Sequence, residues 1–219
     1  MSARLRIGVF DYGAGNLHSL LKVLETDFTD VRIATDAHHA ITDVDALVLP
    51  GVGAFAPAAQ RLAPAREAVA HAVRNGLPCL GICLGMQLLF DGSDEGGGVG
   101  LGLFSGRVTQ LATTRVPQIG WNALEDVRDV LMQESALRIA YFANSFVCRP
   151  DAADARFVTA WSEHDGDRYP AAIRRGMLVG TQFHPEKSSA SGVRMVRAFL
   201  TASMTARDAG LTPWVEEFR

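Results

Sequence analysis

The sequence has few cysteines, little net charge and no long apolar run. Its three cysteines, Cys79, Cys83 and Cys148, are too few for a disulfide framework in 219 residues, which favours a reducing, cytoplasmic location. The net charge of -3 lacks the basic excess that nucleic-acid binding needs. The longest apolar runs, such as 77–84, are far too short to cross a bilayer. We therefore expect a cytoplasmic protein that binds neither nucleic acid nor membrane.

Two ligand sites are disfavoured by their spacing. Cys79 and Cys83 lie in a strand-to-turn segment without a second Cys/His pair at finger-like spacing, so we expect no metal site. A glycine-rich turn at 11–16 lacks the third glycine of a dinucleotide fingerprint, because His18 stands in its place. We therefore expect no nucleotide cofactor either.

Alternating segments in the first half predict an α/β fold. Short apolar runs at Leu5–Phe10, 31–34, 45–49 and 78–82 are typical of buried parallel strands. Apolar residues at helical spacing occur at 17–24, 58–73 and 84–90, with Pro64 interrupting the second of these helices. This alternation predicts a mostly parallel sheet with helices on both faces. Ligands then bind at the carboxyl ends of the strands, where the glycine-marked loops 50–53 and 81–85 lie.

The second half predicts shorter, more antiparallel strands. They are expected near 108 and at 118–121, 138–142, 157–161, 171–174 and 177–182, with a hairpin turn at 174–177. The glycine-rich stretch 91–106 predicts a flexible connection, and 188–202 a last helix. With 48% hydrophobic residues, the chain fits a single α/β domain over 1–204, followed by a C-terminal tail at 205–219.

The segment around Cys83 carries the first chemical motif. Gly81 and Gly85 flank this cysteine at the spacing of a G-x-nucleophile-x-G elbow. In such an elbow the nucleophile sits at a strained strand-to-helix corner, and the glycines let neighbouring backbone approach. The start of a helix favours a thiolate there. The alternative is a buried structural cysteine between two turn glycines.

The second chemical motif is Gln182-Phe183-His184-Pro185-Glu186, which follows a predicted strand. The spacing lets Glu186 fold back and hold the far nitrogen of the His184 imidazole, as the carboxylate does in a nucleophile–base–carboxylate triad. A cysteine nucleophile needs such a base, because a free thiol is only a few per cent thiolate at neutral pH. The alternatives are a capping glutamate before the last helix and a surface histidine.

These two motifs occur in sequence order with four others, at 11–17, 50–53, 117–122 and 141–142. The cysteine elbow and the Phe183-His184-Pro185-Glu186 segment resemble the class I, or triad, glutamine amidotransferases. The other four narrow the resemblance to the glutaminase subunits of imidazole glycerol phosphate synthases, which serve histidine biosynthesis. The resemblance extends over about residues 5 to 200.

This resemblance implies an enzyme that hydrolyses glutamine to glutamate and ammonia. The ammonia then passes through a tunnel to a (β/α)8 cyclase subunit, the partner in a heterodimer. There it reacts with a phosphoribulosyl-formimino aminoimidazole carboxamide nucleotide and gives imidazole glycerol phosphate and aminoimidazole carboxamide ribotide. Neither a metal nor an organic cofactor is implied.

The resemblance also implies roles for individual residues. The triad is Cys83, His184 and Glu186, and the oxyanion donors come from Leu84 and from Val52 or Gly53. The implied contacts with glutamine are Gly51, Gln87, Glu95, Asn144, Ser145 and Phe146. Many family members have His-Ser-Tyr where this sequence has Asn144-Ser145-Phe146, and few extend as far as Thr205–Arg219.

Three other functions remain open from the residues. The chain could feed ammonia to another synthase, for example one that amidates a sugar. It could be a stand-alone cysteine hydrolase, which would act without a partner. It could also be a non-catalytic interaction subunit, although Cys83, His184 and Glu186 are all present.

Overall fold

The core of the molecule is one seven-stranded sheet. The computed structural model describes residues 3–13, 17–51 and 53–210. The strands of this sheet are β1 (Leu5–Phe10), β2 (Thr29–Ala34), β3 (Ala46–Leu49), β4 (Cys79–Ile82), β10 (Val158–His164), β11 (Asp167–Arg175) and β12 (Leu178–Thr181). Their order is β10-β11-β12-β4-β3-β1-β2. Strands β3 and β4 are buried along their whole length, as expected for apolar runs that are covered on both faces.

The direction of the strands divides the sheet in two. From β12 to β2 every neighbouring pair is parallel, whereas β10, β11 and β12 pair antiparallel at one edge. The β11–β12 hairpin turns at Gly176, whose φ of 58° suits glycine. The predicted α/β class, with a mostly parallel first half and a more antiparallel second half, is therefore confirmed.

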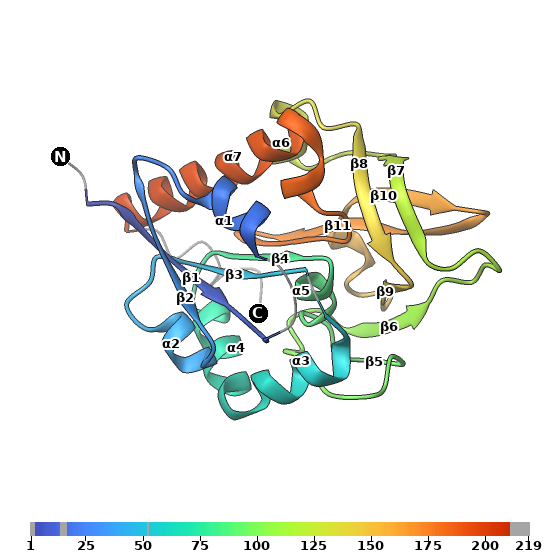
Figure 1. Cartoon of the computed structure of the whole chain (residues 1–219), viewed down its shortest axis with the longest axis horizontal. Helices are drawn as coiled ribbons and strands as arrows, with labels where there is room; N and C mark the ends of the chain where they lie inside the picture. The colour runs from blue at the N-terminus through green and yellow to red at the C-terminus, as the bar shows by residue number, and fades with distance from the viewer. Residues whose placement is uncertain (1–2, 14–16, 52, 211–219) are drawn as a thin grey trace.

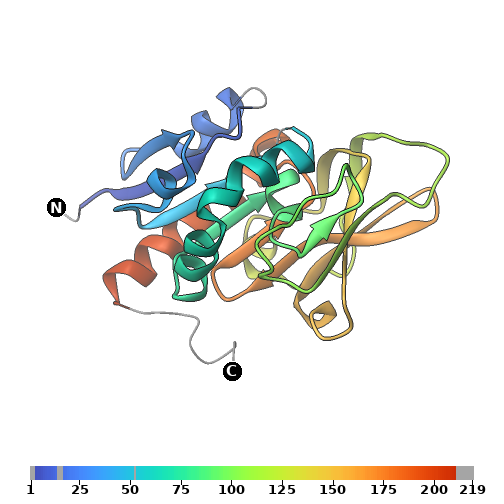
Figure 2. The same cartoon turned by 90° about the horizontal axis from the view of Figure 1, so that it is seen from below.

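Helices cover both faces of the sheet (Figures 1 and 2). One face carries α1 (His18–Leu24) and α7 (Ser189–Asp208), and the other carries α2 (Ala37–Ile41), α3 (Phe55–Leu62) and α4 (Arg66–Arg74). The predicted interruption at Pro64 is present, as a short 3₁₀ turn, η1 (Ala63–Ala65), between α3 and α4. No helix among residues 3–13, 17–51 and 53–210 is long and apolar enough to cross a membrane.

Helix α7 is longer than the sequence pattern predicted. It ends at Asp208 rather than near 202, and Ser203 and Ala206 are buried. Part of the expected tail therefore belongs to the last helix. The remainder of that tail, 211–219, lies outside the described residues.

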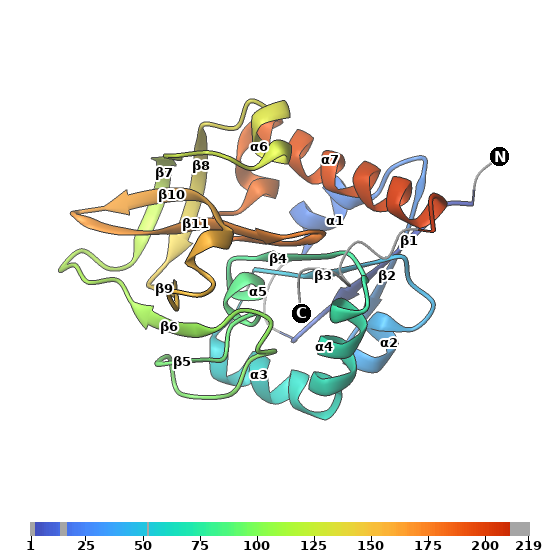
Figure 3. The same ribbon diagram turned by 180° about the vertical axis from the view of Figure 1, so that it is seen from behind.

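Two small sheets extend the molecule beyond the antiparallel edge (Figure 3). One contains β5 (Gly92–Ser93), β6 (Gly106–Gln110) and β9 (Phe146–Pro150), and the other pairs β7 (Gln118–Ala123) with β8 (Ile139–Asn144). The sequence pattern missed β9, α2 and the short helix α6 (Val130–Glu134). It also made α5 (Leu84–Gln87) too long.

The glycine-rich stretch 91–106 is not the loose connection that its composition predicted. A Cβ at Gly100 would lie 2.0 Å from the backbone oxygen of Phe90, and one at Gly106 would lie 2.3 Å from that of Arg149. Leu101, Leu103 and Phe104 of the same stretch are buried in the core. The glycines here permit close backbone packing, and that expectation was wrong.

Candidate active site

The elbow at Cys83 has the sharp turn that the glycine spacing predicted. Cys83 adopts φ 48° and ψ -103° between β4 and α5, a conformation that L-residues rarely occupy. A Cβ at Gly81 would lie 2.7 Å from the backbone oxygen of Gly85, and a Cβ at Gly85 would lie 2.0 Å from that of Leu49. Only glycine fits at either position, so these residues hold the corner in its strained form.

His184 directly precedes the short 3₁₀ turn η3 (Pro185–Lys187) that follows β12, and Glu186 lies within that turn. The Nδ1 atom of His184 is 2.8 Å from Oε1 of Glu186, and the two side chains are 3% and 7% exposed. The turn is fixed by Ser188, whose hydroxyl donates to the His184 carbonyl at 2.7 Å and accepts from the Tyr141 N–H at 2.9 Å. The imidazole is therefore held in one orientation with its far nitrogen on a carboxylate.

The charge state of His184 follows from its neighbours. Burial by itself opposes protonation, but hydrogen bonding and charge from Cys83 and Glu186 outweigh it and raise the pKa of His184 to about 10. The imidazolium is thus favoured at neutral pH.

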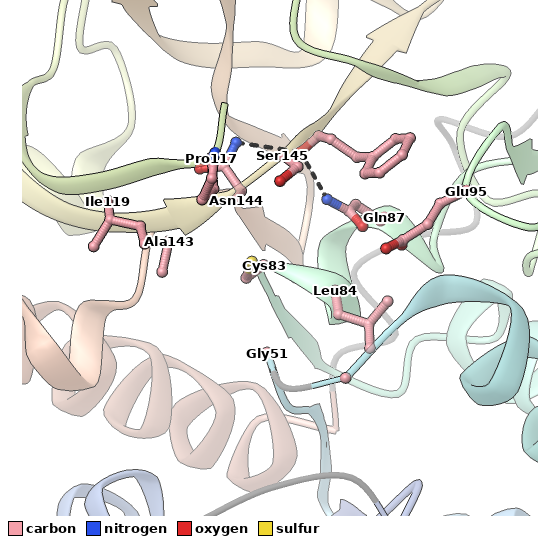
Figure 4. Close-up of a pocket in the computed structure, with 12 residues that line it drawn as sticks. Gly51, Cys83, Leu84, Gln87, Glu95, Pro117, Ile119, Ala143, Asn144 and Ser145 are labelled. Carbon is pink, nitrogen blue, oxygen red and sulfur yellow. Dashed lines mark hydrogen bonds between the residues drawn. The ribbon is translucent and has the colours of Figure 1, made fainter. Parts of the chain in front are cut away.

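A cavity of about 240 Å³ opens in front of Cys83 (Figure 4). It brings together most of the predicted site residues from β3, α5, the β5 segment and β8–β9. Its lining comprises Gly51, Gly53, Cys83, Leu84, Gln87, Glu95, Pro117, Ile119, Ala143, Asn144, Ser145 and Phe146. Val52 falls outside the described residues.

The chain departs from the usual His-Ser-Tyr at Asn144 and Phe146, and the Asn144 side chain is hydrogen-bonded to the backbone carbonyl of Phe146. The Phe146 carbonyl accepts from Nε2 of Gln87 at 3.0 Å and from Nδ2 of Asn144 at 3.2 Å (Figure 4). Both amides are buried. They hold the 144–146 backbone against α5, so the departure leaves an ordered cavity wall.

Comparison with known proteins decides between the open functions. Residues 9–202 match the family described as glutamine amidotransferase class-I. The chain is 43% identical over 204 residues to the imidazole glycerol phosphate synthase subunit HisH of Halobacterium salinarum, covering 89% of this chain and 92% of that protein. It is 39% identical over 198 residues to the HisH protein of Leifsonia xyli, covering 86% and 94%.

The chain belongs to the class I glutamine amidotransferases. As a member of that family it hydrolyses glutamine and transfers the ammonia. A solved structure of a putative GMP synthase component from Thermoplasma acidophilum has the same fold, with a TM-score of 0.71 at 19% identity, over 96% of this chain and 99% of that one. Another solved structure, of a glutamine amidotransferase, has a TM-score of 0.68 at 21% identity, over 90% and 98%.

Gln182, which the sequence pattern did not single out, lies against Cys83. Gln182 is buried, and its Nε2 lies 3.5 Å from the Cys83 sulfur. Its place two residues before His184, as the one polar side chain between β12 and that base, is a signal that could have identified it. Among the described residues, no group of three or more His, Cys, Asp or Glu side chains could hold a metal ion.

Proposed function

We propose that this chain is the glutaminase subunit of an imidazole glycerol phosphate synthase, with Cys83 as its nucleophile. The observation that carries the proposal is the position of Cys83, at a strained turn between the His184–Glu186 pair and the cavity. The HisH relatives support the histidine-pathway assignment over a sugar-amidating paralogue. We place the enzyme in the cytoplasm, in keeping with its three free cysteines.

The proposed reaction begins with attack of the Cys83 thiolate on the side-chain amide carbon of glutamine. The oxygen that becomes negative is stabilised by the Leu84 N–H and by an N–H of the 51–53 loop, from Val52 or Gly53. The His184 imidazolium then gives its proton to the leaving nitrogen, which departs as ammonia and leaves a thioester on Cys83. His184, now neutral, takes a proton from water, and the hydroxide releases glutamate and restores the thiolate.

The cavity lining supplies the proposed contacts with glutamine. Glu95 carries the negative charge that an α-ammonium group requires, and Gln87 lies one helical turn beyond Cys83. Asn144, Ser145 and Phe146 form a further part of the wall of this cavity. Gly51 lines the same cavity, and glycine is required there because a Cβ would lie 2.9 Å from Cε1 of His184.

We propose that the cyclase docks on the outer face of the β7–β8 pair. Trp121 and Ile139 on this face are 55% and 56% exposed, and Ile119 is 67% exposed. The rings of Trp121 and Tyr141 stack edge to face across the two strands. Ile119 also lines the cavity, so this apolar patch adjoins the cavity from which ammonia leaves. Exposed apolar patches of this kind are typical of protein interfaces.

The deciding experiment is co-purification with a candidate (β/α)8 cyclase, followed by glutaminase assays. We expect slow hydrolysis by the free chain. When partner and acceptor nucleotide are present, kcat should rise roughly 10²–10³-fold, which is the rate effect of one hydrogen-bond donor to the oxyanion. A Cys83→Ala complex is the matched control, since it should make product only from added ammonium salt. Equal kcat for the free chain, the complex and the complex with acceptor would instead indicate a stand-alone hydrolase.

A further inference from the structure

The Cys83 sulfur has a hydrogen-bond donor besides His184. Gln182 Nε2 lies 3.5 Å from Cys83 Sγ, which is a normal length for an N–H···S contact, and both side chains are buried. The polar atoms of buried amide groups nearly always have hydrogen-bond partners. The contact therefore puts a neutral donor directly on the atom that reacts.

The orientation of the Gln182 amide is dictated by its other neighbour. A backbone carbonyl can only accept, so the 3.0 Å contact between Gln87 and the Phe146 carbonyl identifies the Gln87 atom as nitrogen. The same nitrogen lies 3.4 Å from the Gln182 amide, which must therefore present its oxygen to Gln87. Turning the Gln182 amide over would set two donors against each other and an oxygen against the sulfur. The N–H of Gln182 consequently faces Cys83.

The helix after Cys83 cannot stabilise a negative sulfur to the same extent. Helix α5 has only four residues, Leu84–Gln87, and the dipole of one turn is small compared with that of a long helix. Stabilisation of a negative sulfur must come mainly from side chains in contact with it. His184 supplies charge, and Gln182 supplies a hydrogen bond of fixed direction.

We propose that Gln182 is a catalytic residue that donates a hydrogen bond to the Cys83 thiolate and is held in that orientation by Gln87. The donor stabilises the thiolate before attack. It also stabilises the sulfur as a leaving group when water resolves the thioester, since negative charge returns to it in that step. This inference rests on the proposed role of Cys83 and extends it. The side-chain amides of Gln87 and Gln182 thereby connect the cavity wall at Phe146 to the nucleophile.

The test measures the rate of Cys83 alkylation by iodoacetamide in the free chain from about pH 5 to about pH 10, with the modified residue mapped by mass spectrometry. Gln182→Met keeps the length but removes the donor. Gln182→Glu keeps the acceptor for Gln87 but cannot donate when ionised. We expect both variants to move the alkylation midpoint upward by roughly one to two pH units, the effect of a hydrogen bond to a charged group.

Turnover supplies a readout that a structural role would not move. At about pH 7 the kcat of Gln182→Met should fall about tenfold or more while KM changes little, and kcat should recover as the pH rises. Gln118→Met, at another buried glutamine that bonds Tyr169, is the control and should keep the midpoint. An unchanged midpoint in either folded Gln182 variant would overturn the inference.

Two outcomes keep this inference separate from the proposed function. Alkylation that maps to a residue other than Cys83 would contradict the nucleophile assignment, whatever Gln182 does. If neither variant folds, the unsubstituted chain decides. Its Gln182 side-chain N–H resonances should shift in NMR spectra over the pH range of the alkylation midpoint, and fixed resonances there would refute the hydrogen bond.

Discussion

The Glu95 carboxylate accepts a hydrogen bond from the backbone N–H of Phe55, with Oε2 2.9 Å from the nitrogen. Phe55 is the first residue of α3, and the preceding Ala54 offers no side-chain cap. Glu95 therefore caps a helix that begins directly after the 51–53 loop. The same carboxylate lines the cavity, so it both caps α3 and places a negative charge where we propose that the substrate binds.

The first prediction separates these two roles of Glu95. Glu95→Gln removes the charge but keeps an oxygen for the Phe55 N–H, so α3 stays capped. We expect KM for glutamine to rise about 10- to 100-fold, as for the loss of a charged hydrogen bond to the α-ammonium group. The steady-state KM should change little in Glu67→Gln, whose side chain is exposed on α4. An unchanged KM in Glu95→Gln would leave Glu95 with the capping role alone.

The second prediction concerns the three cysteines. Burial raises the pKa of Cys79 and Cys148, which makes both poor nucleophiles at neutral pH. A diazo-ketone analogue of glutamine should therefore add one label per chain, at Cys83. Peptide mapping should find that label in Cys79→Ala and Cys148→Ala and no label in Cys83→Ala. Labelling of either buried cysteine in the folded protein would contradict the assignment.

Much of the site could be predicted because its backbone conformation requires particular residue types at particular positions. Gly81 and Gly85 are required by close backbone contacts, and the apolar runs of β3 and β4 are required by burial on both faces. These are local requirements, so periodicity and glycine spacing report them.

The features that were missed depend on contacts between distant segments. Gln182 contacts Gln87, 95 positions away. Glu95 was predicted as a site residue, but its hydrogen bond with Phe55, 40 positions away, was not. Strand β9 is defined by its pairing with β6, and Gly100 and Gly106 are required by the backbone packed against them. Local pattern carries no signal of such partners, because the fold alone brings them together.

The third prediction follows from the raised pKa of His184. The pKa is about 10 in the folded chain and near 6.5 when unfolded. The unfolded state therefore loses this proton first as the pH rises, and stability is lost between these two values. Because the raised pKa of His184 depends partly on its contact with Cys83, we expect a loss of about 1–3 kcal/mol in the unfolding free energy from about pH 6.5 to about pH 10.

The control for this pH effect is His184→Gln, which keeps Cys79 and Cys148 and hence their own contribution above neutral pH. Urea unfolding of both proteins at the two pH values gives the difference that belongs to His184. The variant should lose less stability over this range. If both proteins lose the same amount, the raised pKa is wrong.

The fourth prediction tests the space behind the glycine loop. A Cβ at Gly51 would lie 2.9 Å from His184 Cε1 and 3.0 Å from Cys83 Cβ. Gly51→Ala should therefore displace base and nucleophile and lower kcat by roughly 10², the cost of a misplaced reacting group. The Cβ of Gly166→Ala meets nothing within 4 Å, but the substitution is strained by the φ of +84° at that position, so it should lose some stability and keep its kcat. Normal kcat in Gly51→Ala would mean that the loop lies farther from the triad than these distances indicate.

The last prediction concerns the cyclase surface. Large aromatic side chains at the centre of interfaces dominate binding energy, and Trp121 is 55% exposed on β7. Trp121→Ala should weaken binding to the cyclase by about 2 kcal/mol or more, roughly 30-fold in Kd. Its stack on Tyr141 lies on the outer face, so hydrolysis by the free chain should stay unchanged.

The matched control is Ile33→Ala on β2, at the opposite edge of the main sheet and 47% exposed, which should bind normally. Calorimetric titration of each variant with the cyclase gives both affinities. Full affinity of Trp121→Ala together with weakened Ile33→Ala would move the interface to the β2 edge, far from the cavity, and would leave ammonia transfer through the β7–β8 face without support.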